Sequence, residues 1–224
     1  MASERRAIVI GDVHGCLDEL QDLLRAAGAG PDDRLISVGD LVCKGPDGLG
    51  VLDWAMTTPN VEVVLGNHER RLLKHWRRGT LSEEKTYDAD VYRQLGSRYD
   101  ECMRFVARWP LTVSGPGFAV VHAGLDPEKP LERQSEADLT NLRRLPGTGR
   151  PWYESYRDER LIVFGHWARR RPVVRRNAVG LDTGCVYGAA LTAVILPERR
   201  FVSVPARRAY RRKEKWDDEL AEAA

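Results

Sequence analysis

Four apolar segments of this chain end beside a glycine and a side chain of a metal-binding type. They read "AIVIGDVHG", "LISVGDLVCKG", "VVLGNHER" and "FAVVHAG", at residues 7–15, 35–45, 63–70 and 118–124. A short apolar run that stops at turn residues is typical of a buried β-strand. Because the carboxyl ends of neighbouring parallel strands meet at one edge of a sheet, these segments predict that several metal-binding side chains gather there.

The first third of the sequence alternates strand and helix patterns. Residues 17–30 carry leucines at helical spacing and end in glycines, between apolar runs at 6–10 and 34–38, and this predicts a βαβ unit. A helix at 47–58, a strand at 61–65 and a helix at 67–79 are expected to follow. Short strand patterns dominate from about residue 111 onward.

Composition favours one globular domain. The chain has 224 residues, of which 42% are hydrophobic and 30% charged, and its net charge of +2 does not indicate a nucleic-acid partner. Four scattered cysteines without a CxxC pair, no secretory segment, and no apolar run near the roughly 20 residues that span a bilayer favour a cytoplasmic protein without a membrane span. We expect a single domain over residues 1–224, with a helical insertion at about 80–108, a loop-rich segment at 127–160, and a charged tail at about 206–224 that is a solvated helix or a disordered end.

The polar residues at the strand ends form a set of hard oxygens and imidazoles. Asp12 and His14 lie two apart, so in an extended chain both side chains point to the same side. The candidate metal ligands are Asp12, His14, Asp40, Asn67, His122 and His166. These ligand types suit manganese, iron, cobalt, nickel or zinc in an open catalytic site rather than a structural thiolate zinc. If all six converge, two cations about 3.5 to 4 Å apart share Asp40 as a bridge and activate water for phosphoryl hydrolysis.

The alternative interpretation makes each histidine a hydrogen-bonded structural residue. Four of the five histidines lie in strand-end segments, however, and only His75 has the surroundings of an ordinary helix residue. Clustering Asp12 and Asp40 without a cation would also cost repulsion and desolvation. We therefore favour a metal site.

The motifs "GDVHG", "GDLVCKG", "GNHE", "HAG" and "GH", in this order over residues 11–166, resemble those of the calcineurin-like metallophosphatases of the phosphoprotein phosphatase superfamily. The resemblance implies an α/β fold, a four-layer αββα β-sandwich flanked by helices. It implies one cation on Asp12, His14 and Asp40 and a second on Asp40, Asn67, His122 and His166. It also implies that His68 is catalytic rather than a ligand, and either donates a proton to the leaving oxygen or positions the phosphate.

One position departs from the protein-phosphatase pattern. Where that pattern has aspartate and arginine, this chain has Cys43 and Lys44. Without the carboxylate that would orient and charge it, His68 should be a poorer general acid. A serine alkoxide needs a proton to leave, whereas a nucleoside di- or triphosphate leaves as a stable anion. The substitution therefore favours phosphoanhydride substrates.

Two longer segments narrow the resemblance. "GDLVCKGPDGLGVL" and "GLDTGCVYGAALTAVIL", at residues 39–52 and 180–196, are similar to those of the symmetrical diadenosine tetraphosphatases and ApaH-like phosphatases. The resemblance implies cleavage of dinucleoside polyphosphates such as diadenosine tetraphosphate to two ADP, or removal of RNA caps in some relatives. It implies two divalent cations, with manganese favoured over cobalt, iron, nickel and zinc.

Several side chains are candidates for binding the substrate. A hydroxide bridging the two metals is expected to attack phosphorus in line, while Lys44 and an arginine complete the phosphate clamp. Arg143 lies between "HAG" and "GH", where the superfamily supplies an arginine, and Arg144 beside it stays open as the alternative. Tyr187 is also expected to face the site.

Other residues have both a functional and a structural interpretation. Candidates for base stacking or core packing are Trp152, Tyr153 and Tyr156, and the arginines at 169–171, 175 and 176 either add positive potential or form a solvated face. Cys16 and Cys185 are interpreted as small buried residues rather than nucleophiles.

Two rival functions remain open. The first is a protein Ser/Thr or Tyr phosphatase with the same metals and a phosphoprotein substrate. The second is a noncatalytic nucleotide or RNA sensor, which should have lost a ligand or His68. Neither loss is seen in the sequence.

Overall fold

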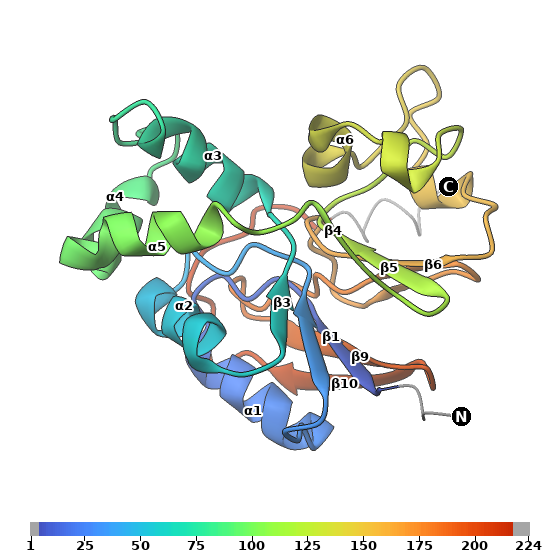
Figure 1. Ribbon diagram of the computed structural model, residues 1–224, viewed down its shortest axis with the longest axis horizontal. Helices are drawn as coiled ribbons and strands as arrows, with labels where there is room; N and C mark the ends of the chain where they lie inside the picture. The colour runs from blue at the N-terminus through green and yellow to red at the C-terminus, as the bar shows by residue number, and fades with distance from the viewer. Residues whose placement is uncertain (1–4, 217–224) are drawn as a thin grey trace.

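Two five-stranded sheets pack face to face in the computed structural model, which describes residues 5–216 (Figure 1). The strand order in the first sheet is β10-β9-β1-β2-β3, and β1, β2 and β3 run parallel while β9 and β10 are antiparallel additions. Its strands are β1 (Ala7–Ile10), β2 (Arg34–Ser37), β3 (Val61–Val63), β9 (Ala190–Leu196) and β10 (Arg200–Pro205). The strand predicted at 61–65 is therefore two residues shorter than expected.

The second sheet has the strand order β4-β5-β6-β8-β7. Its central strands β5, β6 and β8 are parallel, so their carboxyl ends lie at one edge. Its strands are β4 (Thr112–Gly115), β5 (Phe118–Val121), β6 (Leu161–Phe164), β7 (Val173–Val174) and β8 (Ala178–Gly180).

Alternation along the strands builds a layered core. In β1, Ala7 and Val9 pack between the two sheets, whereas Ile8 and Ile10 join the cluster beneath α1. Two helices, α1 (Leu17–Ala27) and α2 (Gly48–Thr57), cover the outer face of the first sheet. The outer face of the second sheet is covered by α6 (Glu136–Asn141) and the 3-10 turns η2 (Leu131–Arg133) and η3 (Trp152–Glu154). The predicted four-layer αββα sandwich is confirmed.

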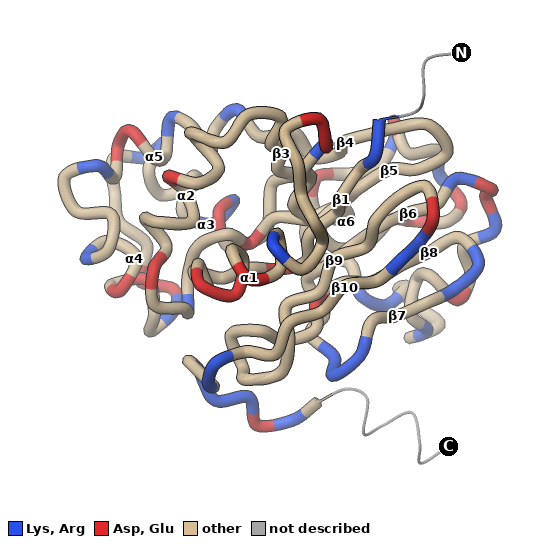
Figure 2. The backbone as a smooth tube through the Cα atoms, turned by 90° about the horizontal axis from the view of Figure 1, so that it is seen from below, with Lys and Arg blue, Asp and Glu red and all other residues tan. Residues whose placement is uncertain are grey.

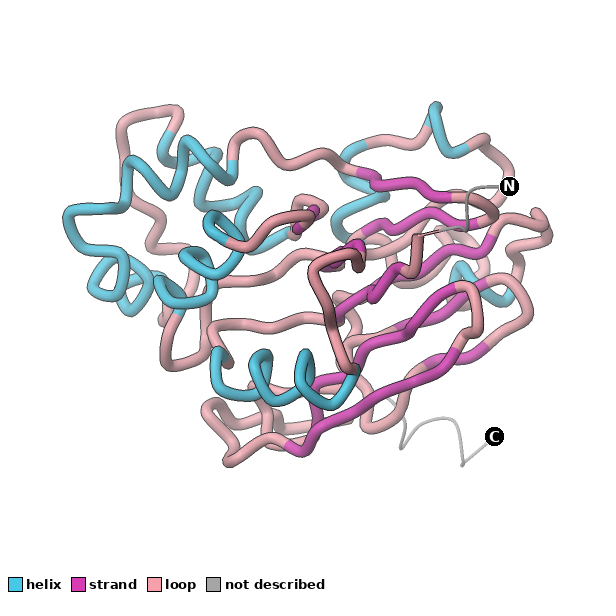
Figure 3. The backbone as a smooth tube through the Cα atoms, turned by 60° about the horizontal axis from the view of Figure 1, so that its bottom comes forward, coloured by secondary structure: helices cyan, strands magenta, loops and turns pink. Residues whose placement is uncertain are grey.

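A group of helices extends from one end of the sandwich (Figure 3). It contains α3 (Asn67–Trp76), α4 (Asp88–Leu95), η1 (Gly96–Arg98) and α5 (Tyr99–Val106). Leu52 of α2, Leu72, Leu95 and Met103 form its buried core. Helical structure was expected at 80–108, and α4 to α5 lie there.

The described part of the C-terminal segment, residues 206–216, contains no helix. Ala209 forms an isolated bridge with Tyr187 and Trp216 is 9% exposed, whereas most of the other side chains in this segment are exposed. The rest of the tail predicted at 206–224 lies outside the described residues. None of the helices in the described part of the chain is long and apolar enough to cross a membrane.

Candidate metal centre

All six predicted ligands lie just beyond the carboxyl ends of strands. Asp12 and His14 follow β1, Asp40 follows β2, and Asn67 begins α3 after the short loop that follows β3. In the second sheet His122 follows β5 and His166 follows β6. The two sheets face each other, so these ends meet at one edge of the sandwich, as the sequence predicted. Their role as ligands stays a prediction.

Asp40 lies at the centre of this group. Its Oδ2 atom is 3.7 Å from His14 Nε2, 3.7 Å from His68 Nε2 and 3.5 Å from His122 Nε2. These separations leave room for cations between the carboxylate and the imidazoles. The Asp40 backbone N–H donates a hydrogen bond to Glu69 Oε2 at 3.1 Å, and this bond fixes the loop that carries Asp40.

Asn67 forms a second focus with two histidines. Its Oδ1 atom is 2.9 Å from His122 Nε2 and 2.9 Å from His166 Nδ1. His122 Nδ1 lies 2.7 Å from the Val38 carbonyl oxygen, to which it must donate. A neutral His122 then has a lone pair at Nε2, facing the Asn67 oxygen with no proton between them. A cation that accepts both lone pairs resolves this conflict.

His14 has the same tautomer for the same reason. Its Nδ1 donates to the Val42 carbonyl oxygen at 3.1 Å, which leaves the Nε2 lone pair directed at the site. Burial, followed by the charge of Lys44, lowers the pKa of His14 to about 3. The pKa of His166 also lies well below its ordinary value, because of burial and then His122 and Arg143. Neutral imidazoles of this kind are the form that binds metal ions.

Two buried carboxyl groups of the site have pKa values shifted in opposite directions. Asp12 accepts the His166 backbone N–H at 3.0 and 3.1 Å, and burial, Asp182 and Asp40 raise the pKa of Asp12 well above its ordinary value. For Asp40, burial raises the pKa, but His122, His68 and His14 outweigh it and bring the pKa well below the usual range. A site with several carboxylates and neutral imidazoles is chemically suited to divalent cations.

The groups of close ligand atoms differ in two respects from the implied assignment. Groups whose ligand atoms all lie within 4.8 Å of one another include His14, Asp40 and His68, and also Asp40, His122 and His166. Within the described chain Asp12 belongs to neither group, although its carboxylate influences Asp40 electrostatically. His68, which was expected to be a non-ligand, stands as close to Asp40 Oδ2 as His14 does.

The backbone around the site is strained. Five of the seven described non-glycine residues with positive φ lie in its loops, namely His14 (50°), Asp40 (51°), Cys43 (73°), Lys44 (67°) and His166 (67°). Each such conformation costs of order 1–3 kcal/mol and persists only where the surroundings impose it. Concentration of strain in the ligand loops is typical of a functional site.

Two glycines let the loops approach the carboxylates. A Cβ at Gly66 would lie 2.2 Å from Asp40 Oδ1, and a Cβ at Gly165 would lie 2.0 Å from Asp12 Oδ1. The glycine before Asn67 and the glycine before His166 are thus required by contact with the acids.

Glu69 and Asp182 were not predicted as site residues. Glu69 accepts the backbone N–H groups of Asp40 and Val42 at 3.1 and 3.0 Å, and burial and then Asp40 raise its pKa to about 8. Asp182 is buried two residues beyond β8, and its pKa is raised chiefly by burial. The apolar run "AVGLD" before Asp182 is a signal like those of the other strand ends and could have identified it.

His68 lacks a partner on one nitrogen. Its Nδ1 atom is buried and has no hydrogen-bond partner among residues 5–216. Its ring stands 5.4 Å from that of Tyr87, and burial brings its pKa well below the ordinary value. The sequence had suggested an imidazole without a charging carboxylate, and this geometry agrees with that suggestion.

Lys44 and Tyr187 lie together beside the ligands. Lys44 Nζ donates to His14 Nε2 at 2.9 Å and lies 5.4 Å from the centre of the Tyr187 ring. Burial lowers the pKa of Lys44, but Tyr187 and Asp40 raise it more, so its pKa ends above the ordinary value. Both residues thus lie close to the predicted ligand His14, and their contact with substrate stays a prediction.

The structure favours Arg143 over Arg144. Arg143 Nη2 donates to the His166 carbonyl oxygen at 3.0 Å, whereas Arg144 donates to Gly149 and packs over Trp167. Of the three candidates for base stacking or core packing, Trp152 and Tyr153 pack in the core, since Trp152 is fully buried and Tyr153 is 5% exposed. Tyr156 is partly exposed and packs against the same cluster.

Comparisons with known proteins agree with this geometry. A family model described as calcineurin-like phosphoesterase matches residues 5–195. The asymmetrical bis(5'-nucleosyl)-tetraphosphatase PrpE of Halalkalibacterium halodurans is 32% identical, over 89% of this chain and 93% of the relative. The symmetrical bis(5'-nucleosyl)-tetraphosphatase of Serratia proteamaculans is 30% identical, over 89% of this chain and 94% of the relative. A crystal structure provisionally described as a diadenosine tetraphosphatase superposes with a TM-score of 0.81 at 35% identity, and covers 92% of this chain and 95% of the other.

Proposed function

The chain belongs to the calcineurin-like phosphoesterases, and from this premise we propose that it hydrolyses the phosphoanhydride bonds of dinucleoside polyphosphates such as diadenosine tetraphosphate. The observation that carries the proposal is the convergence of Asp40 with three imidazoles at 3.5–3.7 Å. Two relatives that are 32% and 30% identical to this chain are named for this activity.

The proposed centre holds two divalent cations, manganese by preference, on Asp12, His14, Asp40, Asn67, His122 and His166. When bound, such cations acidify water and neutralise phosphoryl oxygens. Lys44 and Arg143 bind the substrate phosphates, because one cationic group lies on either side of the ligand cluster. Tyr187 fixes the Lys44 ammonium through its ring.

His68 is assigned a positioning role with weak acid function. Its Nδ1 has no partner in the described chain, so no carboxylate accepts a hydrogen bond there to stabilise the protonated ring, and the pKa of His68 is low. This suits a leaving group that departs as a stable anion. It suits a protein phosphatase poorly, since a serine alkoxide needs proton donation.

The position of cleavage is proposed as symmetrical, with two ADP as products. Relatives of both cleavage types match this chain. Analysis of the products from diadenosine tetraphosphate tests this point, because symmetrical cleavage gives two ADP and asymmetrical cleavage gives AMP plus ATP. A cytoplasmic location is part of the proposal, and it is supported by four free, buried cysteines.

Replacement of Asn67 tests the site. With manganese and diadenosine tetraphosphate, we expect Asn67→Ala to lower kcat at least about 10²-fold, because it removes an oxygen shared by His122 and His166. Asn177→Ala is the control, since the Asn177 side chain donates to the Asp158 carbonyl oxygen on another loop, away from the predicted ligands. An unchanged rate in Asn67→Ala means that the site is wrongly placed. Faster turnover of a phosphoserine peptide than of the dinucleotide favours the protein-phosphatase alternative.

A further inference from the structure

A basic groove begins at the metal centre and follows α3. It encloses about 780 Å³ and is lined by residues from Asn67 at one end to Lys85 at the other, with Glu136 and Asn141 of α6 on the opposite wall. An ion pair between Arg70 and Glu136 links the two walls. Figure 1 shows α3 and α6 on either side of this edge of the sandwich.

The groove has a strong excess of positive charge. Its lining contains two acids, Glu84 and Glu136, against six cations, which are Arg70, Arg71, Lys74, Arg77, Arg78 and Lys85. Positions 70, 74, 77 and 78 recur at the three- and four-residue spacing that places side chains on one face of a helix. The charges therefore form a row that leads away from Asn67.

Half of these cations form no ion pair with the residues that the structure describes. Arg71 pairs with Asp88, Arg70 with Glu136 and Lys74 with Glu84. Arg77, Arg78 and Lys85 are exposed, and none forms an ion pair with another residue in the range 5–216.

Helix stability explains this pattern only in part. Cations in the last turn of α3 interact favourably with its dipole, which accounts for Arg77 and Arg78. It does not account for Lys85, which lies outside the helix, or for a hollow that opens onto a predicted ligand. Repulsion within the row is relieved by an anionic occupant.

We propose that this groove binds a linear phosphate chain, so that the substrates include inorganic polyphosphate. The proposal rests on the proposed function of the metal centre. In the reaction, water oxygen bonds to one phosphorus and the anhydride P–O bond breaks. The electron pair stays on the departing phosphate oxygen, and the protons of water pass to that oxygen and to solvent.

The lining favours a phosphate chain over a nucleic-acid strand. Trp109 is the single aromatic residue among the described lining residues, and its ring packs against Phe105 at 5.7 Å. Binding of a single strand relies on successive aromatic faces that stack the bases. Charge without stacking suits a chain that is anionic along its whole length.

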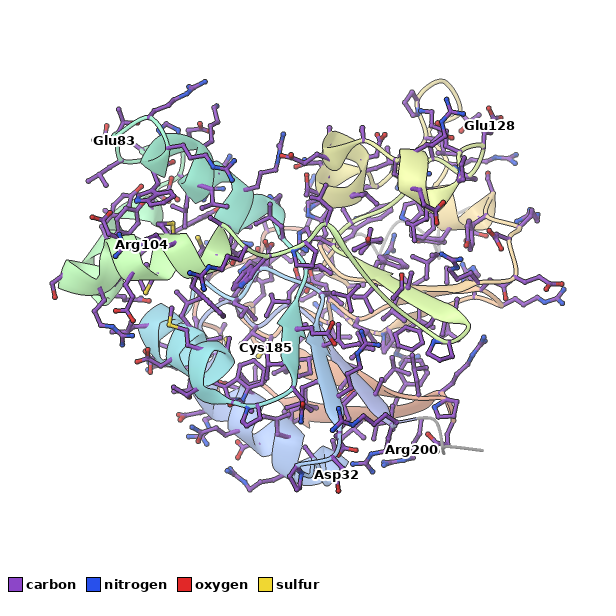
Figure 4. The ribbon with its side chains drawn as sticks, viewed as in Figure 1. Asp32, Glu83, Arg104, Glu128, Cys185 and Arg200 are labelled. Carbon is purple, nitrogen blue, oxygen red and sulfur yellow. The ribbon has the colours of Figure 1, made fainter. Side chains whose placement is uncertain are left out.

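Charge reversal of the unpaired arginines tests the proposal. The variant is R77E/R78E, and the control R104E/R200E reverses two exposed arginines outside the groove (Figure 4). In the manganese-loaded enzyme we expect R77E/R78E to raise the KM for long-chain polyphosphate about tenfold, and the KM for tripolyphosphate much less, because only the long chain reaches from the metal centre to Arg77 and Arg78. The control should change neither KM by more than about twofold.

Direct binding separates this inference from the proposed function. Titration of long-chain polyphosphate into wild-type protein should show binding that weakens about tenfold in R77E/R78E, whether or not any substrate is hydrolysed. Circular dichroism and thermal melting of both variants check the fold. Equal losses for short and long chains, equal losses in the control, or tighter binding of single-stranded RNA than of polyphosphate would each overturn the proposal. Absence of all hydrolysis, with binding as expected, would instead reject the proposed function.

Discussion

At the residue scale, we expect position 43 to affect how well His68 acts as an acid, because the protein-phosphatase pattern has an aspartate where this chain has Cys43. The Cys43 thiol is buried, and burial and then Glu69 raise its pKa well above the ordinary value, so it cannot supply the negative charge that an aspartate would. Arg71 Nη2 lies 4.0 Å from the sulfur and pairs with Asp88. A carboxylate at position 43 would therefore have a cation beside it.

Cys43→Asp should shift activity toward phosphomonoesters. A charged partner near His68 favours its protonated form, and general acid catalysis is worth about 10²–10⁴-fold where the leaving group needs a proton. We expect the ratio of kcat/KM for p-nitrophenyl phosphate to that for diadenosine tetraphosphate to rise at least about tenfold. Cys43→Ser is the control for size and should leave the ratio unchanged. If both variants give the wild-type ratio, the leaving-group argument fails.

The motifs predicted that the candidate ligands lie close together, because each candidate lies within a few residues of the end of a strand. Local patterns indicate where a strand ends, and parallel pairing brings these ends together within each sheet. Packing of the two sheets then brings Asp40 beside His122. Such local patterns could not predict the role of Glu69. This side chain accepts hydrogen bonds from the backbone N–H groups of Asp40 and Val42, which lie 29 and 27 residues away in sequence. The choice between Arg143 and Arg144 likewise required the position of the His166 carbonyl oxygen.

At the element scale, the C-terminal segment fixes the loop that carries Lys44. Arg211 Nε donates to the Lys44 carbonyl oxygen at 3.1 Å, and its guanidinium also pairs with Asp90 of α4. Tyr210 and Arg211 both donate backbone N–H groups to Val186 O at 3.0 Å, beside Tyr187. Lys and Arg predominate along this segment (Figure 2). Composition could not predict these contacts, because they join residues that are far apart in sequence.

Arg211→Ala should weaken substrate binding more than turnover. Lys44 has a φ of 67°, and loss of the bond to its carbonyl oxygen lets the loop leave this strained conformation. Loss of a charged hydrogen bond costs about 1.5–3 kcal/mol, of which part appears in binding, so we expect KM to rise about three- to tenfold with a smaller fall in kcat. Steady-state kinetics with diadenosine tetraphosphate measures the split. Arg212→Ala, which changes an exposed neighbour, should behave as wild type, and a matching rise in KM there would refute a specific role for Arg211.

At the scale of the whole molecule, the metal centre links folding stability to cations and to pH. Burial raises the pKa of Asp12, Asp182 and Glu69, so the folded chain without metal holds protons that the unfolded chain has released. Such groups stabilise the fold at low pH, and their contribution is lost as pH rises toward the folded pKa, which is about 8 for Glu69. Buried histidines with lowered pKa values act in the opposite direction, but only below about pH 6.5, where unfolded imidazole becomes charged.

Between pH 7 and pH 8.5 the buried histidines no longer contribute to the pH dependence of stability, whereas the buried acids still do. The metal-free protein should therefore lose stability across this interval. Saturation with manganese at about 100 times its dissociation constant adds about 2.7 kcal/mol, which raises Tm by about 5–10 °C for a chain of this size. Metal should also flatten the pH dependence, because bound carboxylates no longer take up protons.

Asp12→Asn relieves the repulsion with Asp182 and Asp40, and should raise the Tm of the metal-free protein while reducing its response to manganese. Thermal melting of chelator-treated and manganese-loaded protein at both pH values measures these effects. Stability that rises from pH 7 to pH 8.5 without metal, or an Asp12→Asn variant with the full wild-type response, would show that the buried acids are not held together by cations.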